Sequence, residues 1–155
     1  MTTTSSALAQ CSVARGVQGL ADEFREIAEA HKTPVAQRCD RCGAGFFPPL
    51  LGCRECGSPE LSWVSCGVTG TVGTFVTVHT AEATPSMAIP RRLLDKVPYT
   101  SVYVVPDALP AVRLPALMLG AQQERLAVGA RVRLHDADGR TVHASIADDD
   151  AKEGR

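Results

Sequence analysis

The chain has 155 residues, of which 45% are hydrophobic and 21% are charged, and its formal net charge at pH 7 is −1. This size and composition fit one folded domain, or a small module joined to a larger one, that buries about 70% of its unfolded surface. The near-neutral charge gives no general attraction to nucleic acid or to anionic lipid. No segment approaches the roughly 18 continuous apolar residues of a membrane span.

The N-terminal segment, residues 1–16, is small and polar, and we expect it to be disordered. It lacks the basic start and the apolar run of a secretion signal. We therefore expect a cytoplasmic protein. In that reducing compartment, cysteines favour metal or redox chemistry over structural disulfides.

Residues 17–33 have the pattern of a helix. Leu20, Phe24 and Ile27 recur at helical spacing, with acidic residues early in the segment and Lys32 late, as the helix dipole prefers. The pattern predicts an N-terminal helix with one apolar stripe, which needs a surface to pack on.

Residues 34–66 contain two Cys-x-x-Cys pairs separated by ten residues, and a glycine follows each pair. Zn²⁺ takes four ligands in a tetrahedron, and two such pairs supply four thiolates. Glycine allows the positive φ that the turn after each pair needs. We predict a zinc ribbon that holds one structural zinc ion through Cys39, Cys42, Cys53 and Cys56.

Other uses of these cysteines fit less well. A thioredoxin-like redox centre has one such pair at the head of a helix. A catalytic zinc needs an open fourth position, whereas cysteine fills all four here. Spacing alone leaves an iron site of rubredoxin type, or disulfides, as alternatives. Cys66 lies outside the pattern, and we expect a small buried residue rather than a nucleophile.

Residues 67–147 contain about five strand-like runs with short turns, which is typical of a small barrel. From Thr71 onward the alternation predicts one strand with Val72 and Val76 on one face and Phe75 on the other. Near the end, Asp138-Gly139 between two alternating runs predicts a hairpin. The charged residues 148–155 predict a disordered tail.

The run from Arg38 to Thr80 resembles the family that pairs a rubredoxin-like zinc ribbon with an acyl-CoA-associated OB-fold. The features that carry the likeness are the two cysteine pairs, an aromatic-Pro-Pro stretch at Phe47–Pro49, Trp63-Val64, Gly70-x-Val72 and Val78-His79. The segments VPYTSVYVVPD and RLAVGARVRL resemble later strands of that family. The fold implied is mainly β: an N-terminal helix, the ribbon, then a five-stranded OB-fold barrel.

The resemblance implies a non-catalytic accessory subunit. Such proteins assemble with thiolase-superfamily enzymes (acyltransferases, ketothiolases or aldolases) as hetero-oligomers, and they help to hold or channel an acyl-CoA thioester. The sequence agrees in that it has no nucleophile elbow, no phosphate-binding glycine loop and no metal site with an open position.

Two segments are candidates for these contacts. An apolar run between the cysteine pairs is a candidate partner-binding surface, since a small ribbon has little core to cover it. Its residues are Phe46, Phe47, Pro48, Pro49, Leu50 and Leu51. The loop after the first barrel strand gathers Arg91, Arg92 and Lys96, which we expect to bind the phosphates of coenzyme A. We expect Leu93 and Leu94 to pack on an apolar surface.

The alternative function is nucleic-acid binding, because zinc ribbons joined to OB-folds also occur in such proteins. That function needs a basic groove with stacking aromatic rings. Aromatic residues make up only 5% of this chain, and the only two tyrosines, Tyr99 and Tyr103, lie in one predicted strand.

Overall fold

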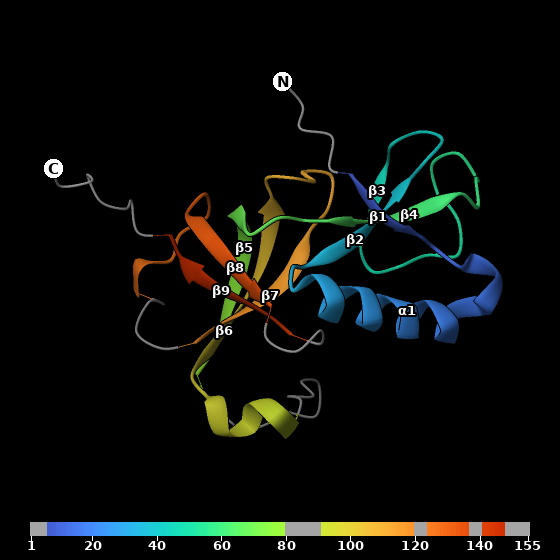
Figure 1. Cartoon of the computed structure of the whole chain (residues 1–155). Coiled ribbons are helices and arrows are strands. Elements are labelled where there is room, and N and C mark those ends of the chain that lie inside the picture. The colour runs from blue at the N-terminus through green and yellow to red at the C-terminus, as the bar shows by residue number, and fades with distance from the viewer. Residues whose placement is uncertain (1–5, 80–90, 120–123, 137–140, 148–155) are drawn as a thin grey trace, which may run out of the picture.

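The computed structural model describes residues 6–79, 91–119, 124–136 and 141–147. These residues form a ribbon sheet with one long helix beside it and a separate β-barrel (Figure 1). The elements in chain order are β1 (Ala7–Gln10), η1 (Val13–Arg15), α1 (Gly16–His31), β2 (Val35–Cys39), β3 (Gly45–Phe46), β4 (Leu61–Ser65), β5 (Thr69–Val78), η2 (Arg91–Lys96), β6 (Tyr99–Pro106), β7 (Leu114–Leu119), β8 (Arg131–Asp136) and β9 (Val142–Ile146).

The first sheet has the strand order β1-β4-β2-β3, with every neighbouring pair antiparallel. The β2–β4 pair runs from Val35 opposite Ser65 to Cys39 opposite Leu61. Trp63 on β4 is fully buried in the core between this sheet and α1. The zinc-ribbon part of the chain thus has a small hydrophobic core of its own.

The N-terminal segment is more ordered than the sequence predicts. Residues 7–10 form β1, an edge strand on β4, and Cys11 N–H then donates to Leu61 O at 2.8 Å. The buried Glu23 carboxylate accepts a hydrogen bond from Ser12 N–H at 3.0 Å. The prediction of disorder is therefore wrong for residues 7–15, because pairing with β4 and Glu23 supplies order that the segment's own composition does not. Residues 1–5 and 148–155 lie outside the described residues.

Helix α1 lies where the sequence predicts a helix, and it packs by its apolar stripe. Leu20 and Ala28 are buried, and the helix ends at Lys32, whose φ of 50° is left-handed and whose N–H donates to Ala28 O. The Phe24 ring lies 5.8 Å from the Trp63 ring, centroid to centroid. The stripe therefore packs on the ribbon sheet.

The second sheet is a closed five-stranded barrel with the order β5-β6-β7-β9-β8. All neighbours are antiparallel except β7 and β9, which pair in parallel at Leu117 and His143. Val72, Val102 and Val132 are among the buried residues inside it. The predicted fold class (mainly β, with an N-terminal helix, a ribbon and a five-stranded barrel) is confirmed. The β8–β9 pair forms as predicted, although its Asp138-Gly139 turn lies outside the described residues.

The alternation predicted for β5 does not persist along the strand. The register between β5 and β6 shifts between Val72 and Thr74, so Gly73 forms a β-bulge. Beyond it Phe75, not Val76, lies opposite the inward-facing Val102. Because a bulge adds one residue to one strand, it exchanges the two faces, and Val76 is 60% exposed.

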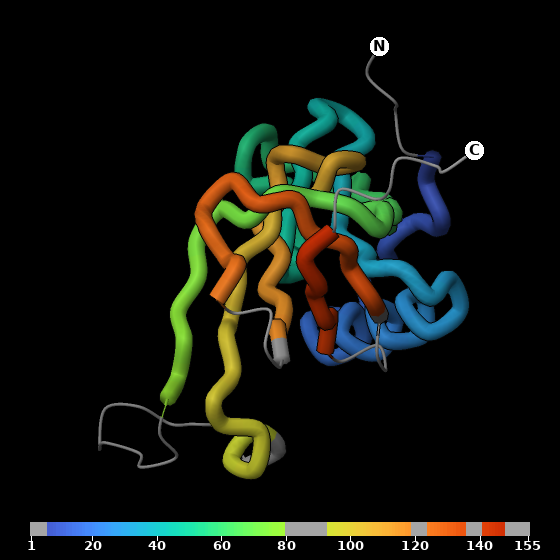
Figure 2. The backbone as a smooth tube through the Cα atoms, turned by 90° about the vertical axis from the view of Figure 1, so that its left-hand side faces the viewer, coloured from blue at the N-terminus to red at the C-terminus, as the bar shows by residue number. Residues whose placement is uncertain are grey.

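The ribbon sheet packs on the barrel, because Ala36 and Val64 of the ribbon belong to the same buried cluster as the barrel core, whereas the short helix η2 lies apart from the ribbon. Figure 2 shows η2 at the far end of β5 and β6, away from the ribbon, with α1 beside the barrel. Leu93 of η2 is buried against Tyr99 and Leu117 on the outer wall of the barrel. The segment that carries the predicted phosphate-binding cations therefore lies against the barrel wall.

Candidate functional site

The two cysteine pairs come together at one end of the ribbon sheet. Sγ of Cys39 lies 3.6 Å from Sγ of Cys56, and Sγ of Cys42 lies 3.5 Å from Sγ of Cys53. All four sulfur atoms lie within 4.8 Å of one another. In a tetrahedron with Zn–S distances of about 2.3 Å, neighbouring sulfurs are about 3.8 Å apart. The four side chains thus already have the spacing of a zinc site.

Each cysteine pair is followed by a glycine turn that returns the chain to the site. Gly43 N–H donates to Cys39 O at 2.9 Å, and Gly57 N–H donates to Cys53 O at 2.8 Å. The two glycines have φ values of 76° and 75°. A Cβ at either position would meet nothing within 4 Å, so glycine is favoured by backbone conformation rather than by space.

The thiols of the site share their protons unequally: the pKa of Cys39 is lowered, whereas the pKa values of Cys42 and Cys56 are raised, because a thiol that loses its proton accepts hydrogen bonds from the others. Burial raises the pKa of the Cys39 thiol, whereas the N–H groups of Cys42 and Arg41, with hydrogen bonds from neighbouring thiols, lower it to about 7. Thiolate is the form that coordinates zinc. Cysteine occupies all four positions, which leaves no open position for a substrate. This geometry fits one structural zinc ion.

The family comparison identifies this part of the chain. Residues 35–62 match the family model described as the ChsH2 rubredoxin-like zinc ribbon domain. This segment is similar to the ChsH2 zinc ribbon. The match to a zinc ribbon model and the sulfur geometry together confirm the prediction of one structural zinc, and the four cysteines are free thiols rather than disulfides.

Two solved structures share the fold of most of the chain. The Ltp2-ChsH2(DUF35) aldolase is similar over 79% of this chain and 90% of that chain, with a TM-score of 0.57 and 22% identity. A protein of unknown function from the DUF35 family of Sulfolobus solfataricus is similar over 85% of this chain and 87% of that chain, with a TM-score of 0.55 and 14% identity. A comparison with curated proteins found no match. The likeness shows that a ribbon followed by a barrel is a fold these proteins share.

The apolar run between the cysteine pairs of the ribbon divides into two parts. Phe46 is 3% exposed and lies beneath the Arg54 guanidinium, 5.5 Å from ring centroid to Cζ. Phe47 is half-buried against Phe24 and the barrel core. The structure thus corrects the prediction for Phe46, which belongs to the ribbon interior and not to a contact surface.

The second part of the run, residues 48–51, faces α1 across a groove. The Gln37 side chain donates to Leu50 O at 3.1 Å and accepts from Leu50 N–H at 2.6 Å. Pro48, Pro49, Leu50 and Leu51 then line one wall of a groove of about 740 Å³. The opposite wall is the face of α1 that carries Val17, which is 72% exposed.

A second cavity, of about 390 Å³, lies along β7 between α1 and η2. We call it the β7 cavity. Its lining is mostly apolar and includes Phe24, Phe47, Leu93, Tyr99, Leu117 and Val142. Sequence reasoning missed this cavity, because its walls come from segments that lie far apart in the chain.

The predicted phosphate-binding residues lie in η2. The loop forms a short 3₁₀ helix over Arg91–Lys96, in which Lys96 is exposed. The side chains of Arg91 and Arg92 lie outside what the structure describes. Leu93 is buried as predicted, but Leu94 is 42% exposed, because one short helical turn presents only one of two adjacent residues to the barrel.

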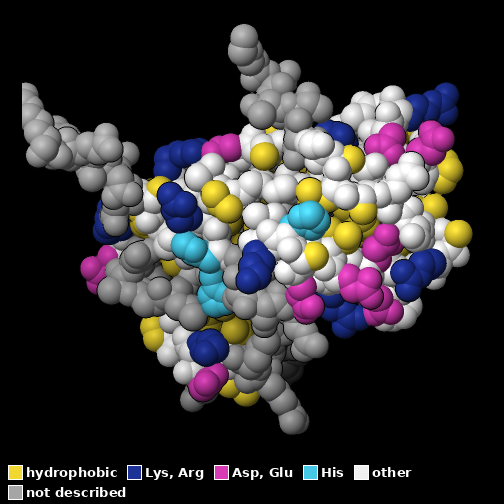
Figure 3. All heavy atoms as spheres, viewed as in Figure 1, with side chains coloured by type: hydrophobic (Ala, Val, Ile, Leu, Met, Phe, Trp, Pro, Cys, Tyr) yellow, Lys and Arg dark blue, Asp and Glu magenta, His cyan; other side chains and the backbone are white. Residues whose placement is uncertain are grey.

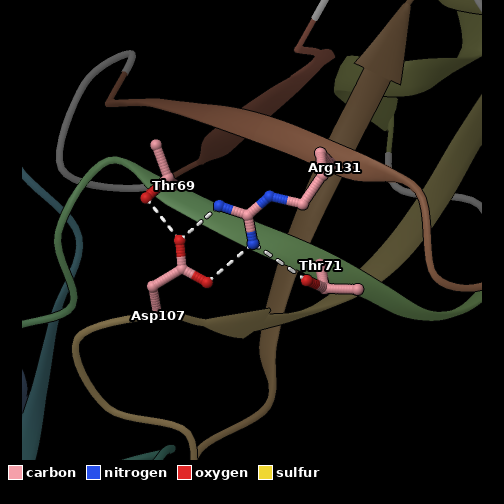
Figure 4. Close-up of polar contacts among 4 residues, drawn as sticks. All are labelled: Thr69, Thr71, Asp107 and Arg131. Atoms are coloured by element: carbon pink, nitrogen blue, oxygen red, sulfur yellow. Dashed lines mark hydrogen bonds and ion pairs between the residues drawn. The ribbon is translucent and has the colours of Figure 1, made fainter. Parts of the chain in front are cut away.

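A polar cluster on the outside of the barrel was not foreseen from the sequence (Figure 4). The Arg131 guanidinium donates to both carboxylate oxygens of Asp107, at 2.8 and 2.6 Å, and to Thr71 Oγ1 at 3.1 Å. Thr69 Oγ1 donates to Asp107 at 2.6 Å. Hydrogen bonds from Arg131 and then Thr69 lower the pKa of Asp107 to about 2. The cluster ties β5, β8 and the end of β6 together where the barrel closes.

The remaining cysteines are structural. Cys66 is fully buried in the barrel core, as predicted, and burial raises its pKa to about 12. Cys11 is 9% exposed in the ribbon core, and burial likewise raises its pKa to about 12. Neither is suited to act as a nucleophile at neutral pH.

Proposed function

We propose that this chain is a non-catalytic subunit that assembles with a thiolase-superfamily enzyme and helps to hold or channel an acyl-CoA thioester. The observation that carries the proposal is the groove between α1 and residues 48–51. Both of its walls are apolar, and they include two of the large hydrophobic side chains that the described part of the chain exposes, Val17 at 72% and Leu51 at 45%. Apolar patches of this kind usually mark contacts with another protein.

The comparisons support this proposal by analogy. One solved structure of similar fold is the Ltp2-ChsH2(DUF35) aldolase, whose name joins a ChsH2 DUF35 chain to Ltp2. The ribbon here matches a ChsH2 domain model. The metal centre also supports a non-catalytic role, since its four ligands are all cysteines. No helix among the described residues is long and apolar enough to cross a membrane.

The acyl-CoA part of the proposal rests on η2 and the β7 cavity. Leu93 fixes η2 on the barrel wall beside the cavity, and Lys96 projects into solvent. Coenzyme A presents phosphate groups to cations and an apolar arm to a cavity, and inter-strand loops of OB-folds commonly bind ligands. Nucleic-acid binding receives less support, because Tyr99 is 6% exposed and only Tyr103 of the two tyrosines has a ring exposed for stacking on a base.

Co-purification from the source cells tests the proposal. Tagged wild-type chain should recover a thiolase-type enzyme, identified by mass spectrometry. The double variant V17S/L51S should lose it while keeping its zinc and its thermal unfolding midpoint. Val128→Ser is a matched control, because Val128 is 67% exposed but does not line the groove. Recovery of the enzyme by V17S/L51S at the wild-type level would refute the groove as the contact surface.

A further inference from the structure

The outward positions of β8 and β9 form a compact set of cationic and hydrogen-bonding side chains, which we call the β8–β9 face. Its members are Arg133, His135, His143 and Ser145. His135 lies directly opposite His143, and Arg133 lies directly opposite Ser145. The alternate residues Val132, Leu134 and Ala144 are buried in the barrel core, so the four members project outward. Side chains directly opposite on antiparallel strands have Cβ atoms about 5 Å apart, so a ligand group over the two strands can contact side chains from both.

One side chain of this face is held in place by another. His135 Nε2 and Ser145 Oγ are 2.7 Å apart, which ties the imidazole on β8 to β9. Arg133 and His135 are exposed, and His143 and Ser145 are half-buried. The face is therefore accessible, and part of it is already ordered.

The charge on this face is not neutralised by its neighbours. The Asp107 carboxylate is occupied by Arg131, two residues before Arg133 on the same strand. Within the described residues, Arg133 has no ion-pair or hydrogen-bond partner, and the outward positions of β8 and β9 carry no carboxylate. Figure 3 shows histidine side chains next to each other over these strands, with Lys or Arg side chains nearby.

The β8–β9 face borders the apolar β7 cavity. His143 pairs with Leu117 in the parallel register between β9 and β7, and Leu117 lines the cavity. Leu117 is also the residue on which Leu93 and Tyr99 pack. A donor-rich cationic face thus adjoins an apolar cavity on one wall of the barrel.

We propose that the β8–β9 face is a phosphate-binding subsite, and that it holds a phosphate of the acyl-CoA thioester while the ligand's apolar part lies in the β7 cavity. The guanidinium of Arg133 presents a planar fork of N–H donors that matches phosphate geometry, and imidazole N–H and serine O–H groups add donors beside it. The identity of the ligand rests on the proposed function, whereas the phosphate chemistry rests on the face itself.

Ligand binding by the full-length, zinc-loaded chain tests the subsite. Calorimetric titrations with coenzyme A, with pantetheine, which lacks phosphate, and with inorganic phosphate compare wild type with R133Q/H143Q. The double variant should bind coenzyme A about tenfold more weakly, the size expected for the loss of charged hydrogen bonds, and pantetheine should bind both proteins equally. Arg113→Gln is the matched control, because Arg113 is an exposed arginine of the barrel that lies outside the β8–β9 face. Its side chain donates to Pro110 O and Val112 O.

Three outcomes would overturn the subsite. The first is no binding of coenzyme A by the wild type, and the second is equal affinity of wild type and R133Q/H143Q for coenzyme A. The third is a single-stranded oligonucleotide that binds the wild type more tightly than coenzyme A does and loses as much affinity in R133Q/H143Q. The last would assign the face to nucleic acid. Co-purification of the partner enzyme by R133Q/H143Q separates the two proposals, because the subsite can fail while assembly persists.

Discussion

The ring of Phe24 on α1 lies 5.8 Å from the ring of Trp63 on β4, in a tilted arrangement. Trp63 is fully buried and is the only tryptophan of the chain. Phe24 also lies 6.0 Å from Phe47, which packs against the barrel core. One helix side chain therefore contacts both the ribbon sheet and the ribbon loop that packs against the barrel, and Trp63 fluorescence reports on that junction.

Replacing Phe24 with alanine should destabilise the protein by about 2 to 3 kcal/mol. This loss is at or below the lower end of the range of about 3 to 5 kcal/mol for Phe→Ala in cores, because Phe24 is only half-buried. Urea unfolding followed by Trp63 emission measures the free energy of unfolding. Phe24→Leu, which keeps most of the apolar volume, should cost less than half as much. An F24A protein as stable as wild type would show that the ring contacts contribute nothing.

Removing one zinc ligand should release the metal. Cys53→Ser leaves three thiolates where four sulfurs lie within 4.8 Å, and metal binding is part of the folding energy of such a ribbon. Elemental analysis should find one zinc per wild-type chain and almost none in C53S, with a red shift of Trp63 emission as the ribbon opens. Cys66→Ala is the control, because Cys66 lies in the barrel core and should leave the zinc content unchanged. Folded wild-type protein without metal would contradict the site.

The zinc-loaded protein should contain no rapidly reacting thiol. Four of the six cysteines are zinc ligands, and burial raises the pKa of Cys11 and Cys66 to about 12. A chromogenic disulfide reagent at pH 8 should titrate almost no thiol in the native protein and all six in denaturant with chelator. Fast reaction of one thiol in the native state would mean that Cys11 or Cys66 is more accessible than its burial indicates.

The Asp107–Arg131 pair should stabilise the barrel over a defined pH range. The folded pKa of Asp107 is lowered to about 2 from 3.8, so the stabilisation is present above pH 4 and is lost as the pH falls through about 2. Because both side chains are more than 40% exposed, the contribution is below about 1 kcal/mol. The stability difference between wild type and Asp107→Asn, compared at each pH, should be constant from pH 7 to 5. It should then fall between pH 4 and 2, and a difference that stays constant down to pH 2 would show that the pKa is not lowered.

Features of the fold that depend on residues close together in the chain could be predicted from the sequence. The zinc ligands were predictable because Cys39, Cys42, Cys53 and Cys56 follow a spacing whose geometry is nearly independent of the rest of the fold. Helix α1 was predictable because its apolar stripe has its own period. The barrel was predictable as a class, since five strand-like runs with short turns have few other arrangements.

Features that depend on distant partners were not predictable. β1 is ordered by β4, about fifty residues later, and the segment itself carries no strong strand signal. The bulge at Gly73 reversed the faces of β5 although the sequence alternates without interruption. Asp107 and Arg131 are 24 residues apart and meet only because the barrel closes. The β7 cavity could not be located, because its walls come from several elements, whereas the wall of the groove at residues 48–51 lies in the run proposed from the sequence as a contact surface.

The last prediction concerns the cations of η2. Leu93 anchors this short helix on Tyr99 and Leu117, and Lys96 remains exposed beside the β7 cavity. If η2 steadies the phosphates of a bound thioester, changing Arg91, Arg92 and Lys96 together to alanine should raise the apparent KM of the complex for its CoA thioester. The expected rise is about tenfold, since charged hydrogen bonds to phosphate are lost.

A control within η2 separates phosphate binding from helix packing. Asp95→Asn removes an exposed carboxylate from the same helix, so it should leave KM unchanged or lower it, because a negative charge near the phosphates is lost. Steady-state kinetics of the co-purified complex, with its subunit ratio checked by size-exclusion chromatography, provide the measurement. An unchanged KM for the triple variant in an intact complex would assign η2 to packing alone, because Leu93 would still hold it on the barrel while the cations contributed nothing to binding.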